Sequence, residues 1–138
     1  MNGTQELKVA VAQFTVRREP EWNLDIIDGY AWQAADAGAR LLVLPEGLIA
    51  RDGDDDMFAA AHAQPLDGPF VTGLRRISEE RHITLMGAVH AVSGAADAVP
   101  DKPASCATDS RVSNVFVVIR DGCLLYTSPS PRDRSLSR

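Results

Sequence analysis

Glu46 is the residue whose position most clearly suggests catalysis, because it directly follows the apolar segment LLVLP (residues 41–45). Four aliphatic residues in a row are typical of a strand buried in a sheet, and α/β proteins bind ligands at the carboxyl ends of their strands. A carboxylate held there and partly desolvated by the strand behind it can act as a general base. Many strands end in an acidic residue, however, so spacing alone favours a structural role.

Candidate nucleophiles and cationic groups are few. The cysteines are Cys106 and Cys123 and the lysines are Lys8 and Lys102, while the other twelve basic residues are arginines. Cys106 and Lys102 lie in a segment rich in Ala, Asp, Pro, Ser and Gly (residues 91–111), which is typical of a loop. Cys123 follows a glycine in a predicted hairpin turn. None of these positions by itself indicates a reactive centre.

Clustered carboxylates in RDGDDD (residues 51–56) raise the possibility of a metal site, because hard cations prefer oxygen ligands. Three consecutive aspartates cannot all face one ion without a tightly wound loop, so a solvated acidic loop is the favoured interpretation. The histidines, at positions 62, 82 and 90, lack the spacing of metal ligands. Arg51 lies near enough to Glu46 to contact an anionic substrate.

Strands and helices alternate along the chain in a pattern that predicts an α/β layered domain. The predicted strands are residues 8–15, 41–44, 83–90, 112–119 and 123–126, and the predicted helices are residues 19–38, 57–63 and 67–82. In the first helix an apolar stripe recurs at the helical period and is expected to face the core. It consists of Trp22, Ile26, Tyr30 and Ala34, with Ile27, Ala31 and Ala35 beside them. Asp67 is the expected N-cap of the last helix, with Pro69 in its first turn. The continuous apolar character of the strands predicts cover on both faces of the sheet.

Composition restricts the class of protein. The 138 residues are 45% hydrophobic and 24% charged, which suits one globular domain. The net charge of -5 argues against nucleic acid or an anionic membrane as the main partner, and no apolar run reaches the roughly 18 residues of a membrane span. Two cysteines and a polar N-terminus without a signal-peptide pattern predict a cytoplasmic, thiol-reduced protein.

Three blocks occur together in a characteristic order: KVAVAQF (residues 8–14), GARLLVLPEGLIARD (residues 38–52) and SNVFVVIRDG (residues 113–122). With the amphipathic helix between the first two, they resemble the nitrilase (carbon–nitrogen hydrolase) superfamily from Lys8 to Leu125. The ARD that ends the second block is similar to the deaminated-glutathione-amidase-like amidases. The resemblance implies a partial hydrolase domain at residues 1–125, with the fold of the N-terminal half of a nitrilase-like α-β-β-α sandwich.

The resemblance also implies a reaction: hydrolysis of a small amide by a Cys–Glu–Lys triad, without a metal or an organic cofactor. The Cys forms a thioester, the Glu takes the thiol proton and later activates water, and the Lys stabilises the oxyanion. Only the Glu has a counterpart here, Glu46. The Lys is expected in a Tyr-x-Lys-like block after Asp121-Gly122, where this chain reads YTSPSPR (residues 126–132). The Cys belongs to a later strand-to-helix elbow.

The last residues differ in composition from the rest. Residues 126–138 are rich in Ser, Arg and Pro, so we expect them to be disordered. The string LLYTSPSPRDR (residues 124–134) resembles translated sequencing adaptor, which predicts a tail foreign to the parent gene. A natural Arg/Ser/Pro tail that is phosphorylated or binds acidic partners is the alternative.

The sequence therefore predicts a fragment of a C–N hydrolase (an amidase), inactive by itself, whose intact parent binds a small amide and forms a homo-oligomer. Two alternatives remain open. One is a truncated product that only binds a partner or has no function. The other is a small doubly wound binding domain in which residues 51–56 respond to a metal ion or a phosphate.

Overall fold

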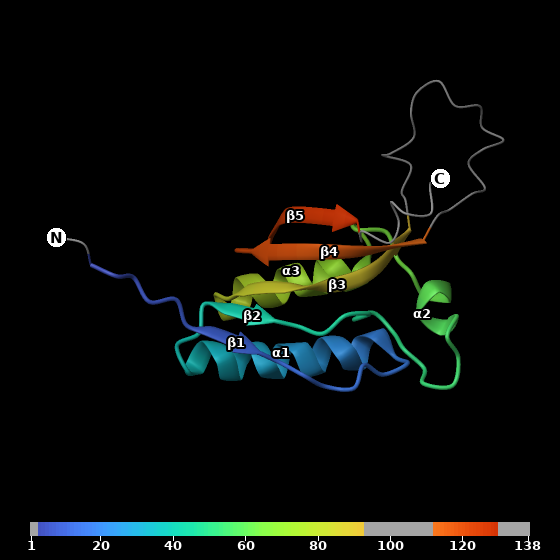
Figure 1. Cartoon of the computed structure of the whole chain (residues 1–138), viewed down its shortest axis with the longest axis horizontal. Helices are drawn as coiled ribbons and strands as arrows, with labels where there is room; N and C mark the ends of the chain where they lie inside the picture. The colour runs from blue at the N-terminus through green and yellow to red at the C-terminus, as the bar shows by residue number, and fades with distance from the viewer. Residues whose placement is uncertain (1–2, 93–111, 130–138) are drawn as a thin grey trace, which may run out of the picture.

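The computed structural model describes residues 3–92 and 112–129. Strands and helices follow the predicted order, with one parallel strand–helix–strand unit at the start and an antiparallel hairpin at the end (Figure 1). The elements are β1 (Val9–Val11), α1 (Pro20–Asp36), β2 (Leu41–Val43), α2 (Phe58–Ala61), α3 (Pro69–Arg81), β3 (Thr84–Val92), β4 (Val112–Arg120) and β5 (Cys123–Pro129).

The five strands form a single sheet in the order β1-β2-β3-β4-β5. β1 pairs with β2 and β2 with β3 in parallel, whereas β4 is antiparallel to both β3 and β5. β5 consequently runs in the same direction as β1, β2 and β3. The carboxyl ends of these four strands therefore point to the same end of the sheet, the end at which Glu46 follows β2.

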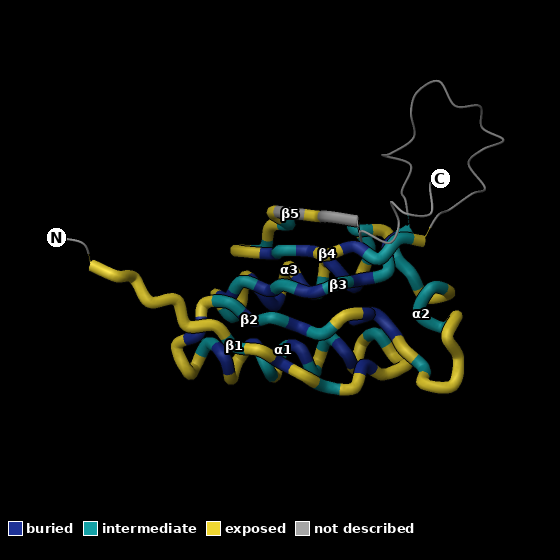
Figure 2. Tube along the Cα trace, in the orientation of Figure 1, coloured by how far each residue is buried: buried dark blue, intermediate teal, exposed yellow. Residues whose placement is uncertain are grey.

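Both long helices cover one face of this sheet and pack against each other, which gives a two-layer α/β arrangement (Figure 1). Burial alternates strictly along β3, where Leu85, Gly87, Val89 and Ala91 face the helices and are buried (Figure 2). The alternate residues of β3 are only partly buried, and Val11 of β1 is 70% exposed. Among the described residues no second layer lies on the other face, which is the arrangement expected of one half of a sandwich whose strands are covered on both faces in the whole domain.

The buried face of α1 largely matches the prediction. Ile27, Ala31 and Ala34 are buried as expected, but Asn23 joins them and Trp22 is 57% exposed. The helix takes this orientation although it turns an asparagine inward, because Asn23 finds hydrogen-bond partners there and Trp22 instead lies beside the Arg17 guanidinium on the surface.

The N-terminus of α3 also differs in detail from the prediction. Gly68, and not Asp67, is the N-cap, and Pro69 is the first helical residue. The Phe70 N–H in the first turn donates to the side-chain carbonyl of Gln64 at 2.9 Å. Gln64, in the segment before the helix, therefore binds a backbone N–H of the first turn that has no partner within the helix. An aspartate at the N-cap is not required for this. None of the helices in the described ranges has the length and apolar character needed to cross a bilayer.

β5 extends beyond Leu125, the predicted end of the hydrolase domain and start of the disordered tail. It continues to Pro129, where Thr127, Ser128 and Pro129 are in register with Val117, Phe116 and Val115 of β4. Backbone pairing explains this, since a ladder uses N–H and C=O groups and needs no apolar side chain. Residues 130–138 of the predicted tail lie outside the described residues.

One ion pair joins the two long helices. Arg81 of α3 binds Asp28 of α1 through two parallel contacts, Nε to Oδ1 at 2.8 Å and Nη2 to Oδ2 at 3.0 Å. The hydrogen bond from Arg81 is the main cause that lowers the pKa of Asp28 below its ordinary value of 3.8, and the charge of Arg81 adds to it. A carboxyl whose pKa is lower in the folded state stabilises the fold only while it is ionised.

The pair therefore predicts a pH dependence with a definite sign. Its stabilisation is fully present above the ordinary carboxyl pKa and is lost as the pH falls through the lower pKa of the folded state. Asp28→Asn should lower the free energy of unfolding at neutral pH, and it should make a smaller difference at an acidic pH below the ordinary carboxyl pKa. Urea titrations of both proteins at the two pH values test this, with Asp25→Asn, an exposed residue of the same helix, as the matched control. An equal loss at both pH values would contradict the ion-pair explanation.

Candidate active site

Glu46 lies in an irregular segment that follows β2 alongside β3. The Leu44 N–H donates to the Met86 carbonyl at 2.7 Å and the Leu48 N–H to the Ala88 carbonyl at 3.2 Å, so both ends of the segment are held. Between them the chain turns at Gly47, whose φ of +66° lies in the left-handed region that glycine adopts without strain. This turn directs Leu48 into the core and leaves Glu46 exposed. The partial desolvation expected from the sequence is therefore not observed, although the strand-end position is as predicted.

Beside Glu46 is a pocket of about 240 Å³ at the carboxyl-terminal end of the parallel strands. Its lining comes from the segment after β2, the loop that follows, α2, β3 and β4: Glu46, Gly47, Arg51, Asp52, Asp55, Asp56, Ala59, His90 and Asn114. Four carboxylates and one guanidinium thus face the same space. This is the arrangement expected of a site that binds a polar molecule and moves protons.

Two residues of the sheet, His90 of β3 and Asn114 of β4, also line the pocket. They are register partners on β3 and β4, so their side chains emerge on the same face, the one opposite to the helices. His90 had been expected at a strand end, but β3 continues to Val92. The side-chain oxygen of Asn114 is buried and has no hydrogen-bond partner among the described residues. An unsatisfied acceptor of this kind is costly in a fold and commonly belongs to a ligand site.

Asn23 fixes the position of the segment that carries Glu46. Its side chain accepts from the Arg17 N–H at 2.8 Å and donates to the carbonyls of Arg17 (2.9 Å) and Ile49 (3.0 Å), and the residue is fully buried. The Arg51 N–H also donates to the Arg17 carbonyl at 3.0 Å. The segment after Glu46 is thereby tied to the β1–α1 connection. The sequence pattern did not single out Asn23 or Asn114. The signal available for each was a polar residue next to apolar residues, in the first helix and in the fourth strand.

The aspartates of the 51–56 loop serve local structure. Asp52 pairs with Arg18 at 2.8 Å and also accepts from the Asp54 N–H at 3.0 Å, and Asp55 accepts from the Met57 N–H at 2.9 Å. Asp54 and Asp56 are exposed. Within the described ranges no three acidic, histidine or cysteine side chains are grouped as metal ligands. The loop therefore forms one wall of the pocket and uses its carboxylates mainly to hold its own turns.

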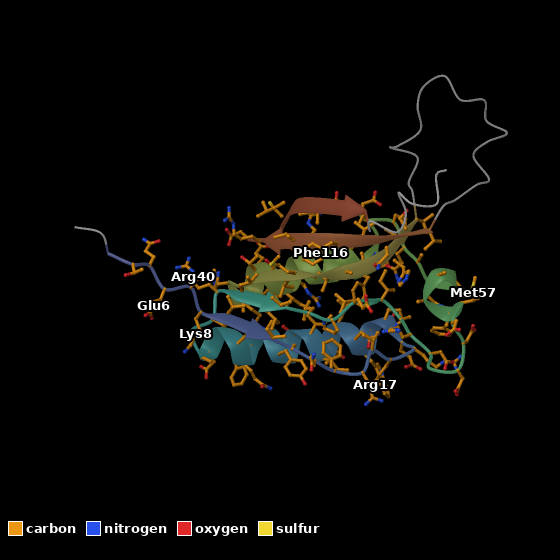
Figure 3. The ribbon with its side chains drawn as sticks, viewed as in Figure 1. Glu6, Lys8, Arg17, Arg40, Met57 and Phe116 are labelled. Carbon is orange, nitrogen blue, oxygen red and sulfur yellow. The ribbon has the colours of Figure 1, made fainter. Side chains whose placement is uncertain are left out.

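The remaining candidate residues lie away from the pocket. Lys8 precedes β1 at the opposite end of the sheet, where its ammonium donates to the Ala37 carbonyl at 2.7 Å (Figure 3). Cys123 is exposed at the start of β5, at that same far end. His62 follows α2 and stacks on Phe58, and His82 caps α3 in a left-handed conformation. Cys106 and Lys102 lie outside the described residues.

Comparisons with known proteins place this chain in context. No family model matches it. A hydrolase of Mycobacterium tuberculosis is 32% identical over 116 residues, covering 84% of this chain and 35% of the hydrolase. The deaminated glutathione amidase of Escherichia coli O157:H7 is 39% identical over 114 residues, covering 83% of this chain and 38% of the amidase. The chain thus spans little more than a third of the length of these relatives.

Solved structures show the same relationship in the fold. An amidase from Nesterenkonia sp. AN1 superimposes with a TM-score of 0.67 at 23% identity, over 91% of this chain and 44% of the amidase. A CN-hydrolase superfamily protein from Xanthomonas campestris superimposes with a TM-score of 0.69 at 19% identity, over 92% and 41% of the two chains. The chain is thus similar in sequence to a hydrolase and to an amidase, and its fold matches somewhat less than half of an amidase and of a CN-hydrolase superfamily structure.

Proposed function

We propose that this chain is the N-terminal part of a C–N hydrolase that cleaves small amides, and that Glu46 is its general base. The observation that carries the proposal is the place of Glu46 at a polar pocket, beyond the carboxyl ends of the parallel strands. β5 runs toward the same end of the sheet, so residues that follow it in a longer chain would start close to this pocket. The similarity to a deaminated glutathione amidase supports the assignment of the reaction class.

In the proposed reaction, a thiol supplied from outside the described residues attacks the amide carbon while Glu46 accepts its proton. The proton passes to the leaving amine, and a thioester forms as the C–N bond breaks. Glu46 then accepts a proton from the water that attacks the thioester, which releases the carboxylic acid and returns the thiol. An exposed carboxylate at the pocket is accessible for both transfers.

The other pocket residues would orient the amide. The unpartnered side-chain oxygen of Asn114 can accept a hydrogen bond from a substrate amide N–H. The remaining carboxylates, those of Asp52, Asp55 and Asp56, repel anions, so a substrate that carries its own carboxylate would be held at Arg51.

The site of this chain is incomplete in our proposal. Within the described residues neither a cysteine nor a lysine lines the pocket, and the chain reads YTSPSPR (residues 126–132) where the resemblance leads us to expect a Tyr-x-Lys-like block. The proposal has three further parts, which rest on the sequence. The hydrolase domain comprises residues 1–125 of this chain, the protein is cytoplasmic, and the whole protein forms a homo-oligomer.

Isolated residues 1–138 should accordingly release no ammonia from small amides above the blank, because loss of a catalytic nucleophile alone costs about a millionfold in turnover. The test is a coupled ammonia assay on small primary amides, with the Nesterenkonia sp. AN1 amidase as the positive control. Ammonia release that scales with the chain's concentration, and that Glu46→Gln abolishes, would contradict the proposal of an incomplete site.

A further inference from the structure

The segment that carries Glu46 is longer than regular strand pairing requires. β2 pairs with β3 in parallel as far as Met86, and the Leu44 N–H donates to the Met86 carbonyl at 2.7 Å. Bonds in a parallel ladder are evenly spaced, so the next donor would be the N–H of Glu46, to the Ala88 carbonyl. Leu48 makes that bond instead, at 3.2 Å. The chain therefore leaves the ladder between the two leucines, and we call these residues, 45–47, the Glu46 loop.

Gly87 of β3 lies between the two accepting carbonyls, at the point where the Glu46 loop closes. A Cβ atom on Gly87 would lie 2.7 Å from the Leu48 Cδ1 and 3.1 Å from the Leu44 Cβ. Its φ is not in the left-handed region, so the fold uses its lack of a side chain and not its backbone freedom. The Leu48 side chain occupies the space that a side chain at position 87 would take.

Neither leucine can make room for a side chain at position 87 without a movement of the main chain. The Leu44 Cβ is bonded directly to the backbone, so it moves only when the backbone moves. The Leu48 Cδ1 is the end of a side chain, but Leu48 is fully buried, and a packed interior has no spare space of methyl size. A methyl group there would therefore displace the Glu46 loop at one or both of its ends.

We propose that Gly87 is a positioning residue of the candidate active site, because its missing side chain seats Leu48 against β3 and so fixes where the Glu46 carboxylate lies. The described lining of the pocket does not include Gly87, so Gly87 acts through the Glu46 loop and not on the substrate. The catalytic part of this role rests on the proposed function, which makes Glu46 the general base. The seating of Leu48 does not depend on that function.

Amide hydrogen exchange of the full 138-residue chain, followed residue by residue by NMR, tests the seating. Gly87→Ala should make the Leu48 N–H exchange at least about tenfold faster, because its bond to the Ala88 carbonyl lies beside the added methyl group. Leu48→Val removes the Cδ1 atom, so in the Gly87→Ala background it should slow this exchange again. In the wild-type background Leu48→Val leaves a gap and should speed it. The same substitution thus has opposite effects in the two backgrounds.

Gly73→Ala is the matched control. Gly73 lies in α3, and a Cβ atom there would come 2.7 Å from the Leu24 Cδ1, the same approach as at Gly87. This contact lies between α1 and α3 and involves the ends of a partly buried side chain, which can turn aside. Gly73→Ala should therefore leave the exchange of the Leu48 N–H at the wild-type rate. Protected amide protons in β3 show that each variant is folded.

Turnover tests the connection to Glu46. It is measured in a hybrid that joins residues 1–125 of this chain to the part of the E. coli deaminated glutathione amidase beyond the matched region. Gly87→Ala should lower kcat by about tenfold or more and change KM by less than about twofold, because a misplaced base slows the chemical step while the pocket lining is kept. Leu48→Val should restore part of kcat in this background. Gly73→Ala should change neither constant.

Each part of the proposal can be overturned separately. Unchanged exchange of the Leu48 N–H in folded Gly87→Ala, or no slowing when Leu48→Val is added, would refute the seating. Altered exchange together with an unchanged kcat in the hybrid would refute the positioning of Glu46. A hybrid that is inactive without substitution would refute the proposed function instead, and exchange in the 138-residue chain then decides the seating by itself.

Discussion

Glu46→Gln is expected to reduce amide hydrolysis by about a thousandfold or more, because the amide keeps the shape of the side chain but cannot accept a proton. The measurement needs a protein that contains the other triad members. A hybrid supplies them: residues 1–125 of this chain, followed by the part of the E. coli deaminated glutathione amidase beyond the matched region. Release of the amine product, cysteinylglycine, from deaminated glutathione then reports on Glu46 within this chain's own pocket.

The matched control for this change is Glu6→Gln. Glu6 is exposed and precedes β1, at the opposite end of the sheet from the pocket (Figure 3). The hybrid with Glu6→Gln should retain full turnover, which separates loss of a base from loss of one negative charge. Full activity of a folded Glu46→Gln hybrid would refute the assignment of the general base.

Asn23→Ala should lower the free energy of unfolding by about 2–4 kcal/mol, because it leaves buried backbone groups without partners. The groups affected are the N–H and C=O of Arg17 and the C=O of Ile49, which the Asn23 side chain binds at 2.8–3.0 Å. Urea titrations at matched protein concentration give this difference. Gln33→Ala, an exposed residue of the same helix, is the control and should change stability little.

Asn23 also links stability to the proposed site. Its loss should loosen the segment that follows Glu46, so amide protons of residues 48–51 should exchange faster in Asn23→Ala than in the wild type. Unchanged exchange in that segment, together with a loss of stability, would show that Asn23 supports only the core.

Much of the fold follows from local sequence patterns. Apolar runs predicted the strands, the helical period predicted α1 and α3, and Pro45 marked the end of β2 before Glu46. These features depend on a few adjacent residues, so a single sequence contains them. The place of Glu46 at the carboxyl end of a parallel strand was predictable for the same reason.

The missed features depend on contacts between distant segments. The orientation of α1 is set by hydrogen bonds from Asn23 to Ile49, 26 positions away, which outweigh the apolar stripe that includes Trp22. The pairing of His90 with Asn114 across residues 93–111 is a matter of register, which no local pattern specifies. The exposure of Glu46 likewise results from the turn at Gly47 and the burial of Leu48.

Turnover by the hybrid without further substitution tests the central claim most directly. If this chain is the N-terminal part of a C–N hydrolase, its residues 1–125 should restore the release of cysteinylglycine from deaminated glutathione to a C-terminal part that is inactive alone. A hybrid that folds, as judged by a cooperative thermal transition, and still releases no cysteinylglycine would contradict the claim.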